Sequence, residues 1–375
     1  MEWKEYQIQD VCRLINGRAY SNDEMLEHGK YKIVRVGNLS GGNSTWFYSD
    51  LELPADKYCH NGDLLFAWAC TFGPHIWKED NTIFHYHIWK IVEDKDVVDR
   101  RFFYYYLKFA TGGFLGALNG SVMVHITKSS MEKMIIRIPK KLEDQRRIAS
   151  ILSSLDRKIE LNNKINADLE EMAQAIFKNW LSECSDEVTI GELSLNITNY
   201  EKTDAEEVVL INSSDVTEGY FDHHNYSPNK NLKGHFKKRF QKGDILYSQV
   251  RPRNRHWAYC NFDANDYLAS TQLMVIRNNP SLITSILLYQ YIISDNVWKE
   301  FTLKTETRSG TFPQGNYEDL SQIRVPYNSD VEGISNQLET LYGKMFMLEK
   351  ENSRLSLLRD TLLPRLMSGE LEIPE

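Results

Sequence analysis

The chain lacks the motifs by which most enzymes bind and activate their substrates. Its 375 residues contain no G-x-x-x-x-G-K-[ST] phosphate loop, no G-x-G-x-x-G, no G-x-S-x-G elbow and no H-E-x-x-H pair. The Asn-Pro-Pro and Asp-Pro-Pro segments of amino-methylating enzymes are also absent. His85 and His87 would share one face of a strand, but no third ligand stands at a useful spacing. We therefore expect no catalytic residue, no metal and no cofactor on this chain.

Long apolar runs and export signals are missing as well. The start, MEWKEYQIQD, has neither a basic n-region nor an apolar h-region, and no apolar run approaches the roughly 18 residues that a membrane span needs. No C-x-x-C pair occurs among the five cysteines Cys12, Cys59, Cys70, Cys184 and Cys260. This pattern is typical of reduced thiols rather than of a disulfide framework or a zinc site. We expect a soluble, cytoplasmic protein with no membrane partner.

The total charge gives little support to nucleic acid as a partner. The formal net charge is -8 at pH 7, which argues mildly against DNA binding. Local clusters of charge matter more than this total. The length of 375 residues is sufficient for two or three domains, each with its own core.

Two stretches of the chain carry a narrow apolar seam with 4-3 spacing. The first runs from Ile148 to Trp180, and the second, from Ile334 to Leu366, superposes on it with a shift of 186 positions. Such a seam predicts coiled-coil helices, which we expect to pack antiparallel so that Asn162 faces Asn352. The expected interface positions are Ile148, Leu152, Leu155, Ile159, Asn162, Leu338, Leu341, Met345, Leu348 and Asn352.

The segments that precede the two helices also repeat each other. GDLLF at 62–66 matches GDILY at 243–247, and IRIP at 136–139 matches IRVP at 323–326. The pattern predicts an α+β fold: two similar mixed α/β domains separated by two long antiparallel helices, with an internal pseudo-two-fold repeat. In the first domain we expect strands at 31–36, 64–68 and 83–92. The expected boundaries are 1–140 and 186–327 for the domains, and 141–185 and 328–375 for the helices.

The candidate binding residues of the second domain are basic. Two clusters of basic residues flank a predicted strand, and the second cluster lies in VRPRNRHW at 250–257. If that loop is extended, as Pro252 favours, its three arginines project the same way. Guanidinium groups suit guanine edges and phosphates, although a solvated basic loop has the same sequence pattern. The candidates are Lys237, Lys238, Arg239, Arg251, Arg253 and Arg255.

The first domain has a less basic counterpart. WACTFGPHIWK at 68–78 follows the matching strand, and GSVMVHITKSS at 120–130 precedes the long helix. Polar and aromatic loops of this kind fit base reading and core packing about equally well. The candidates are Trp68, Thr71, Lys78, His125 and Lys128. Two domains with the same scaffold but different loops would recognise different DNA sequences.

Residues 136–181 combine a proline-ended strand, an acidic-Gln pair, I-A-x-x-L, L-D-x-x-I and a helix ending in Phe-x-x-Trp. The residues of this pattern are Pro139, Asp144, Gln145, Ile148, Ala149, Leu152, Leu155, Asp156, Ile159, Phe177 and Trp180. In this pattern the segment resembles the central region of specificity subunits of type I restriction-modification enzymes. LLPRLMSGELEIPE at 362–375 is similar to the C-terminal end of the family. The second repeat departs from the pattern, because Asp330-Val331-Glu332 stands in place of the acidic-Gln pair and Gly343 interrupts the helix.

The resemblance implies a non-catalytic subunit that takes part in phage defence. Each target-recognition domain would read one half of a split site in double-stranded DNA and recruit a methyltransferase subunit. A restriction subunit would complete the complex, with S-adenosylmethionine, ATP and Mg on the partner subunits. Two alternatives stay open: a partner chain that combines cleavage and methylation, and a stand-alone DNA-binding regulator.

Overall fold

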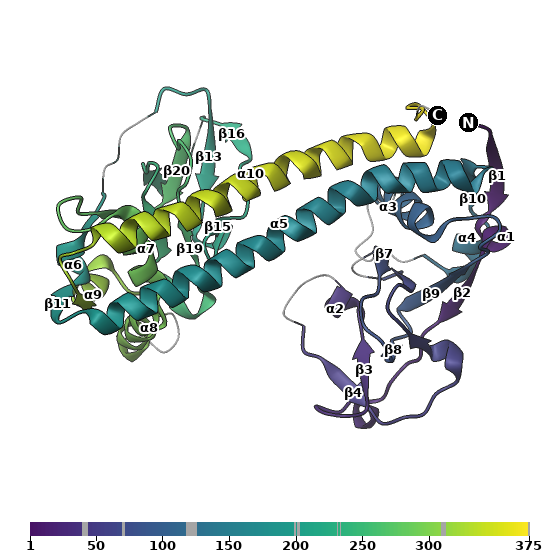
Figure 1. Ribbon diagram of the computed structural model, residues 1–375, viewed down its shortest axis with the longest axis horizontal. Helices are drawn as coiled ribbons and strands as arrows, with labels where there is room; N and C mark the ends of the chain where they lie inside the picture. Colours follow the sequence, from purple (N-terminus) through teal and green to yellow (C-terminus); the bar gives the residue numbers. More distant parts are fainter. Residues whose placement is uncertain are drawn as a thin grey trace. The chain divides into compact units, whose positions relative to one another are not determined.

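The computed structural model describes residues 1–39, 44–69, 72–117, 126–198, 200, 203–230, 232, 234–308 and 313–373. The chain folds into two compact units. Unit 1 comprises Met1–Leu161 and Glu351–Glu375, and unit 2 comprises Asn162–Lys350. Each unit contains a globular part and one end of each long helix, so the division runs through the helices. Figure 1 shows the globular part of unit 1 in purple and blue and that of unit 2 in teal and green.

The described strands of unit 1 form three sheets. β1 pairs with β10, a second sheet has the order β2-β9-β6-β7, and a third has the order β4-β3-β8-β5. Neighbouring strands are antiparallel except for β3 and β8. The strands are β1 (Trp3–Gln7), β2 (Cys12–Asn16), β3 (Tyr31–Val34), β4 (Phe47–Ser49), β5 (Tyr58–Cys59), β6 (Leu64–Ala67), β7 (Gly73–Ile76), β8 (Thr82–Phe84), β9 (Ile88–Glu93) and β10 (Ile135–Pro139).

Unit 2 repeats these sheets in the same order. β11 pairs with β22, and the four-stranded sheets run β12-β21-β18-β19 and β16-β13-β20-β17, again with one parallel pair, β13 and β20. The strands are β11 (Asp186–Thr189), β12 (Ser194–Asn196), β13 (Glu207–Ile211), β14 (Val216–Thr217), β15 (Tyr220–Phe221), β16 (Tyr226–Pro228), β17 (Phe236–Lys238), β18 (Ile245–Ser248), β19 (Trp257–Tyr259), β20 (Tyr267–Ser270), β21 (Leu273–Asn278) and β22 (Arg324–Tyr327). This shared topology confirms the predicted repeat of two α/β domains.

The helices follow the same repeat. The long helices are α5 (Leu142–Glu183) and α10 (Glu332–Ser368). The shorter helices and 3-10 turns are α1 (Ile8–Val11), η1 (Asn22–Glu24), α2 (Val36–Leu39), η2 (Ala55–Lys57), α3 (Arg100–Ala117), α4 (Lys128–Glu132), α6 (Ile190–Leu193), η3 (Ser213–Asp215), η4 (Pro252–Asn254), α7 (Ser285–Ile293), α8 (Asp295–Arg308) and α9 (Tyr317–Ser321). Helix α10 continues through Gly343, so the glycine does not interrupt it. No helix in these described ranges combines the length and apolarity that crossing a bilayer requires.

The single strand predicted at 83–92 is wrong. β8 ends at Phe84 and β9 begins at Ile88, with a turn between them that the Ile88 amide closes by donating to the His85 carbonyl at 2.9 Å. The chain leaves one sheet and enters the other here, which an apolar pattern does not reveal. His85 and His87 therefore do not share a strand face. The strand predicted at 31–36 ends earlier, at Val34, where α2 soon follows.

The long helices run antiparallel within each unit. In unit 1, Arg359 Nη1 donates to Asp156 Oδ1 at 2.8 Å, and Glu351 lies 3.3 Å from Lys158, so residue numbers rise on one helix as they fall on the other. Every expected seam position is buried or half-buried. Asn162 belongs to unit 2 and Asn352 to unit 1, and their pairing stays a prediction.

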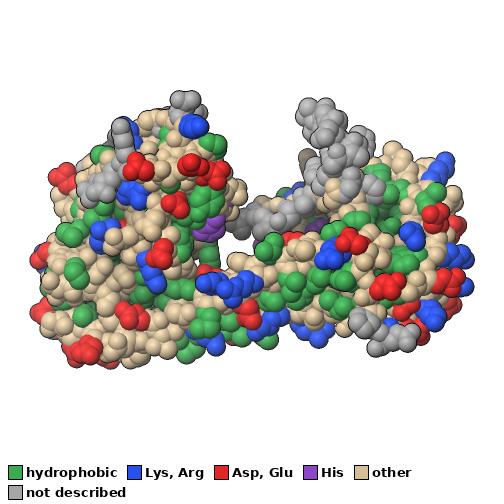
Figure 2. All heavy atoms as spheres, turned by 90° about the horizontal axis from the view of Figure 1, so that it is seen from above, with side chains coloured by type: hydrophobic (Ala, Val, Ile, Leu, Met, Phe, Trp, Pro, Cys, Tyr) green, Lys and Arg blue, Asp and Glu red, His purple; other side chains and the backbone are tan. Residues whose placement is uncertain are grey.

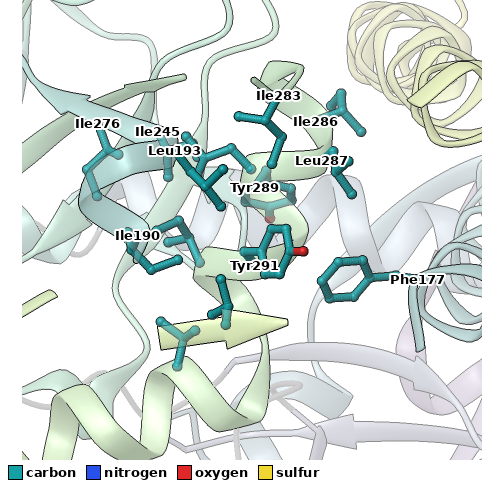
Figure 3. Close-up of a cluster of buried hydrophobic side chains, with 14 of the residues drawn as sticks. Phe177, Ile190, Leu193, Ile245, Ile276, Ile283, Ile286, Leu287, Tyr289 and Tyr291 are labelled. Carbon is teal, nitrogen blue, oxygen red and sulfur yellow. The ribbon is translucent and has the colours of Figure 1, made fainter. Parts of the chain in front are cut away.

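Each long helix enters the core of a globular part. In unit 1, Ile148 and Leu152 of α5 are fully buried in the cluster that contains Phe102 and Phe103. In unit 2, the Phe177 ring meets the edge of Tyr291 on α7 with centroids 5.0 Å apart (Figure 3). This burial of large apolar side chains supplies most of the free energy that joins the long helix to the globular parts.

Gln145, the glutamine of the acidic-Gln pair, joins several elements of unit 1 through hydrogen bonds. Its side chain is completely buried, and its Nε2 donates to the carbonyls of Pro139 at 2.8 Å and Val97 at 2.9 Å. Its Oε1 accepts from the Asp99 amide at 2.8 Å, just before α3. One side chain thus joins the end of β10, the start of α3 and the first turn of α5.

In unit 2, other residues form the corresponding hydrogen bonds. Val331 stands where the repeat would place a glutamine, and a valine cannot pair with a carbonyl. The Tyr291 hydroxyl donates instead to the carbonyl of Pro326, the proline that matches Pro139. Thr284, the N-cap of α7, also donates to the buried Ser335 of α10 at 3.1 Å.

A relay of hydrogen bonds then links each globular part to both long helices. In unit 1, the Tyr105 hydroxyl of α3 donates to Asp156 of α5 at 2.6 Å, and Asp156 also accepts from Arg359 of α10. In unit 2, Gln290 of α7 donates to the Tyr342 hydroxyl of α10, which donates to Glu170 of α5 at 2.9 Å. The relays connect matching elements through different side chains.

Replacing Gln145 by Leu should destabilise unit 1 strongly. The leucine is apolar and of similar size, but it leaves three backbone groups without their partner, at about 1 to 3 kcal/mol for each one that stays buried. The matched control is Gln337→Leu, at an exposed glutamine of α10. Urea unfolding followed by far-UV circular dichroism measures both. Equal midpoints for the two variants would contradict the role of Gln145.

Candidate nucleic-acid interface

One turn of unit 2 lies between its two basic stretches. The Thr271 amide donates to the His235 carbonyl at 2.8 Å, directly before β17. The Gln249 amide donates to the Gln272 carbonyl at 2.9 Å, at the start of the β18–β19 loop. Lys237 and Arg251 therefore flank the same β20–β21 turn. We define rim 2 as the exposed or half-buried residues His235, Lys237, Gln249, Arg251, Thr271 and Gln272.

The arginine loop is not extended, contrary to the sequence prediction. Pro252–Asn254 forms the 3-10 turn η4, and the flanking Arg251 and Arg255 have left-handed φ values of 48° and 54°. The fixed φ of proline suits the first position of a helical turn as well as an extended chain, so Pro252 did not discriminate between them. The three arginines consequently do not project in one direction.

Helix α8 holds this loop. Trp298 Nε1 donates to the Pro252 carbonyl at 2.9 Å, and Arg253 Nη2 donates to Glu306 at 2.6 Å. The Arg255 guanidinium lies 4.4 Å from the centroid of the Trp298 ring and donates to Asp295 at 3.4 Å. Exposed ion pairs contribute little to stability in water, so either guanidinium can exchange its carboxylate for a phosphate at little cost.

Lys238 is buried and binds backbone carbonyls inside unit 2. Its side chain is buried, and its ammonium donates to the Leu273 carbonyl at 2.7 Å and the Thr271 carbonyl at 3.3 Å. Burial lowers the pKa of this ammonium. Lys238 thus holds the β20–β21 turn, whereas Lys237 on the opposite face of β17 is exposed and Arg239 is half-buried.

The matching end of unit 1 is aromatic rather than basic. The β6–β7 loop and the β8–β9 turn correspond to the two loops of rim 2. Trp68 Nε1 donates to the Tyr86 carbonyl at 2.9 Å, and the Trp68 ring meets the edge of His87 at 5.0 Å. We define rim 1 as Trp68, His85, Tyr86 and His87. Thr71 of the same loop lies outside the described residues.

The two histidines of rim 1 stay neutral near pH 7. Burial lowers the pKa of His85 to about 4, with repulsion from His87 and Arg35 adding to the effect. Burial also lowers the pKa of His87. Neutral imidazoles offer one donor and one acceptor each, which suits hydrogen bonding to base edges. The parts of the chain that the structure describes contain no group of three His, Cys, Asp or Glu side chains arranged for a metal.

The other candidates of the first domain lie apart from rim 1. Lys78 follows the far end of β7, and its ammonium pairs with Glu160 of α5. Lys128 begins α4, where it lies 3.6 Å from Glu132. His125 lies outside the described residues.

Sequence reasoning missed Tyr86, Gln249 and Gln272. The repeat itself could have revealed them, because it aligns the β8–β9 turn with the β20–β21 turn and the β6–β7 loop with the β18–β19 loop. Basic residues are interspersed with acidic ones on the visible face of each unit (Figure 2). The distinction between the rims is therefore one of local side-chain chemistry and not of overall charge.

Comparisons with known proteins show which proteins this chain is similar to. Residues 1–171 match the family described as the type I restriction modification DNA specificity domain. The specificity subunit of the type I restriction enzyme HindI from Haemophilus influenzae is 32% identical over 179 residues, which cover 47% of this chain and 39% of that protein. The MjaIX specificity subunit from Methanocaldococcus jannaschii is 24% identical over 313 residues, 75% of this chain and 71% of that one.

A solved structure shares the fold over almost the whole length. The S subunit of a type I restriction-modification system from M. genitalium superposes with a TM-score of 0.63 at 15% identity, covering 98% of this chain and 96% of that one. This chain spans less than half the length of the first curated relatives that it matches.

Replacing His85 by Asn should reduce the acid sensitivity of the fold. Because the native pKa is about 4 against an ordinary 6.5, the unfolded chain takes up a proton between these values and the native chain does not. Stability contributed by neutral His85 is present above pH 6.5 and is lost as the pH falls toward 4. Urea midpoints across this window measure the loss, with the exposed His28→Asn as control. Parallel pH curves for wild type and His85→Asn would disprove the assignment.

Proposed function

We propose that this chain is a specificity subunit of a type I restriction-modification enzyme and that it selects the DNA site on which such a complex acts. The observation that supports this most is the contrast between the rims. Two globular parts of one topology present unlike side chains at matching ends. Such an arrangement suits a split site in double-stranded DNA whose two halves differ in sequence.

Rim 2 carries the groups for direct base reading and for phosphate binding. The side-chain amides of Gln249 and Gln272 suit adenine, which offers a paired donor and acceptor in the major groove. Arg251 suits guanine or a phosphate, and the point charge of Lys237 suits a phosphate. We place the second half-site on these four side chains.

Rim 1 would read the other half-site in a different way. The Trp68 indole and the Tyr86 ring, which is 40% exposed, offer apolar surface to a thymine methyl or an unstacked base. The neutral imidazoles of His85 and His87 add hydrogen-bonding groups without a charge. Phosphate contacts would then fall mainly on rim 2 and on partner subunits, which is compatible with the acidic total of this chain.

The chemistry would reside on the partners. The sequence contains none of the catalytic motifs sought above, so we assign methyl transfer to methyltransferase subunits with S-adenosylmethionine. ATP and Mg would serve a restriction subunit. The contribution of this chain is to position those subunits at a chosen sequence.

Methyl transfer should require both this chain and its partner. The assay follows transfer to DNA with the methyltransferase subunit alone, with this chain alone and with the two together. We expect activity at specific sites only for the combination. Methyl transfer by this chain alone would refute the proposed division of labour.

Substitutions in the rims should relax different halves of the site. Arg251→Ala should cost about 1 to 3 kcal/mol and relax a base of the second half-site if Arg251 pairs with guanine. If it binds phosphate, affinity should fall for all sequences and the salt slope should shrink by about 0.9. Trp68→Ala should relax the first half-site only. Sequencing of methylated adenines in cells that carry the complete system measures the relaxation of each half-site.

The matched control is Arg324→Ala, at an exposed arginine of β22 that pairs with Glu187. It should leave affinity, site choice and salt slope unchanged. Normal specificity and salt dependence for Arg251→Ala and Trp68→Ala would remove the rims from the recognition surface.

A further inference from the structure

Unit 2 contains a cavity of about 550 Å³ where its globular part meets α5 and α10. It is separate from rim 2 and plays no part in the proposed reading of DNA. Its lining combines carboxylates, tyrosines and one buried amide. The residues on which the inference depends are Asn166, Glu170, Tyr259, Tyr289, Tyr342 and Glu349.

Aromatic rings form much of the wall. Tyr259 and Tyr289 have centroids 5.3 Å apart, and Tyr289 meets the edge of Tyr342 at 5.9 Å. Phe346 stacks on Tyr259 at 5.6 Å. Ring faces carry a negative potential, and several of them around one space attract an organic cation.

Two carboxylates from the two long helices face the same space. Glu170 of α5 accepts from the Tyr342 hydroxyl at 2.9 Å, and Glu349 of α10 accepts from Asn261 at 3.4 Å. Burial, opposed by the hydrogen bond from Asn261 and helped by the negative charge of Glu170, raises the pKa of Glu349 to about 7. A cation in the cavity would stabilise both carboxylates in their charged form.

A buried acceptor lacks a donor at the same place. Asn166 is 7% exposed and lines the cavity. Its amide nitrogen donates to the Met345 carbonyl at 3.4 Å, but its Oδ1 accepts no hydrogen bond from any residue that the structure describes. Such an oxygen normally has a protein, water or ligand donor.

The repeat places a lysine in unit 1 at the position where unit 2 has an amide. Lys78 follows β7 and forms an exposed ion pair with Glu160 of α5. Asn261 follows β19 at the matching position and pairs with Glu349 of α10. Unit 1 therefore supplies an ammonium group from its own chain, whereas unit 2 supplies a neutral amide.

We propose that this cavity binds an organic cation with primary ammonium groups, held by Glu170 and Glu349 against the tyrosine rings and beside Asn166. A free polyamine and a lysine side chain of another protein carry the same chemistry. The ligand would bridge α5, α10 and the globular part of unit 2.

Binding should release protons near neutral pH, because the cation favours the charged form of Glu349. The other titratable or charged groups that line the cavity are Glu170, Glu218, Tyr220, Arg255, Tyr259, Tyr289 and Tyr342. The guanidinium of Arg255 is a cation of the lining itself, and it contacts Trp298 and Asp295.

Titration calorimetry of the full chain tests the proposal with two probes, spermidine and Nα-acetyl-lysine methylamide, at pH 7 in buffers of different ionisation enthalpy. We expect saturable binding of at least one probe, with a heat that depends on the buffer. Tighter binding of spermidine identifies a free polyamine as the ligand class, and tighter binding of the lysine derivative identifies a side chain. No saturable binding of either overturns the proposal.

Three variants show where the probe binds. Glu349→Gln and Asn261→Lys should each weaken binding about tenfold or more, the first by removing charge and the second by placing a lysine as unit 1 does. Glu160→Gln in unit 1 is the matched control and should bind like wild type. Circular dichroism verifies that each variant is folded. Equal affinity of Asn261→Lys and wild type would overturn the proposal even if Glu349→Gln failed to fold.

Discussion

The relays of hydrogen bonds from the domain helices to the long helices are the constraint on which the placement of each rim depends. Apolar burial holds each globular part to the long helices, but it is non-directional and tolerates sliding. A hydrogen bond does not, because a slip that leaves a buried polar group unpaired costs about 1 to 3 kcal/mol. Each relay starts on a domain helix and ends on the far long helix, so one displacement breaks two bonds. The relays are Tyr105–Asp156–Arg359 in unit 1 and Gln290–Tyr342–Glu170 in unit 2.

The two units show that the required contacts persist while the residues that make them change. Each unit has a strand that carries a proline just before a long helix, and the carbonyl of that proline must be paired. Gln145 of the helix meets the requirement in unit 1, and Tyr291 of the domain helix meets it in unit 2. Val331 therefore stands in place of the glutamine because the hydrogen-bond donor lies on α7 in unit 2. A search for the glutamine alone would miss that both units must pair the proline carbonyl.

The sequence predicted what depends on periodicity and repetition, and failed where tertiary contacts decide. The 4-3 spacing predicts the two long helices, and the repeated segments predict the duplicated topology. The segment 83–92 failed because strands of two different sheets follow each other with a continuous apolar pattern. Lys238 looked exposed because the carbonyls that bind it belong to residues 33 and 35 positions later. Arg251 was placed correctly on a loop, but its left-handed backbone depends on Trp298 of a distant helix.

That backbone gives a physical reason to regard the loop as functional. Residues other than glycine in the left-handed region cost of order 1 to 3 kcal/mol and persist only where their surroundings enforce them. Among the described residues, the non-glycine positions of this kind are Asn81, Glu218, Arg251 and Arg255, so two of the four flank one 3-10 turn. Solubility alone would not require a basic loop to be strained and then fastened to a helix. Base reading does, because a bidentate contact requires a guanidinium at a fixed position and angle.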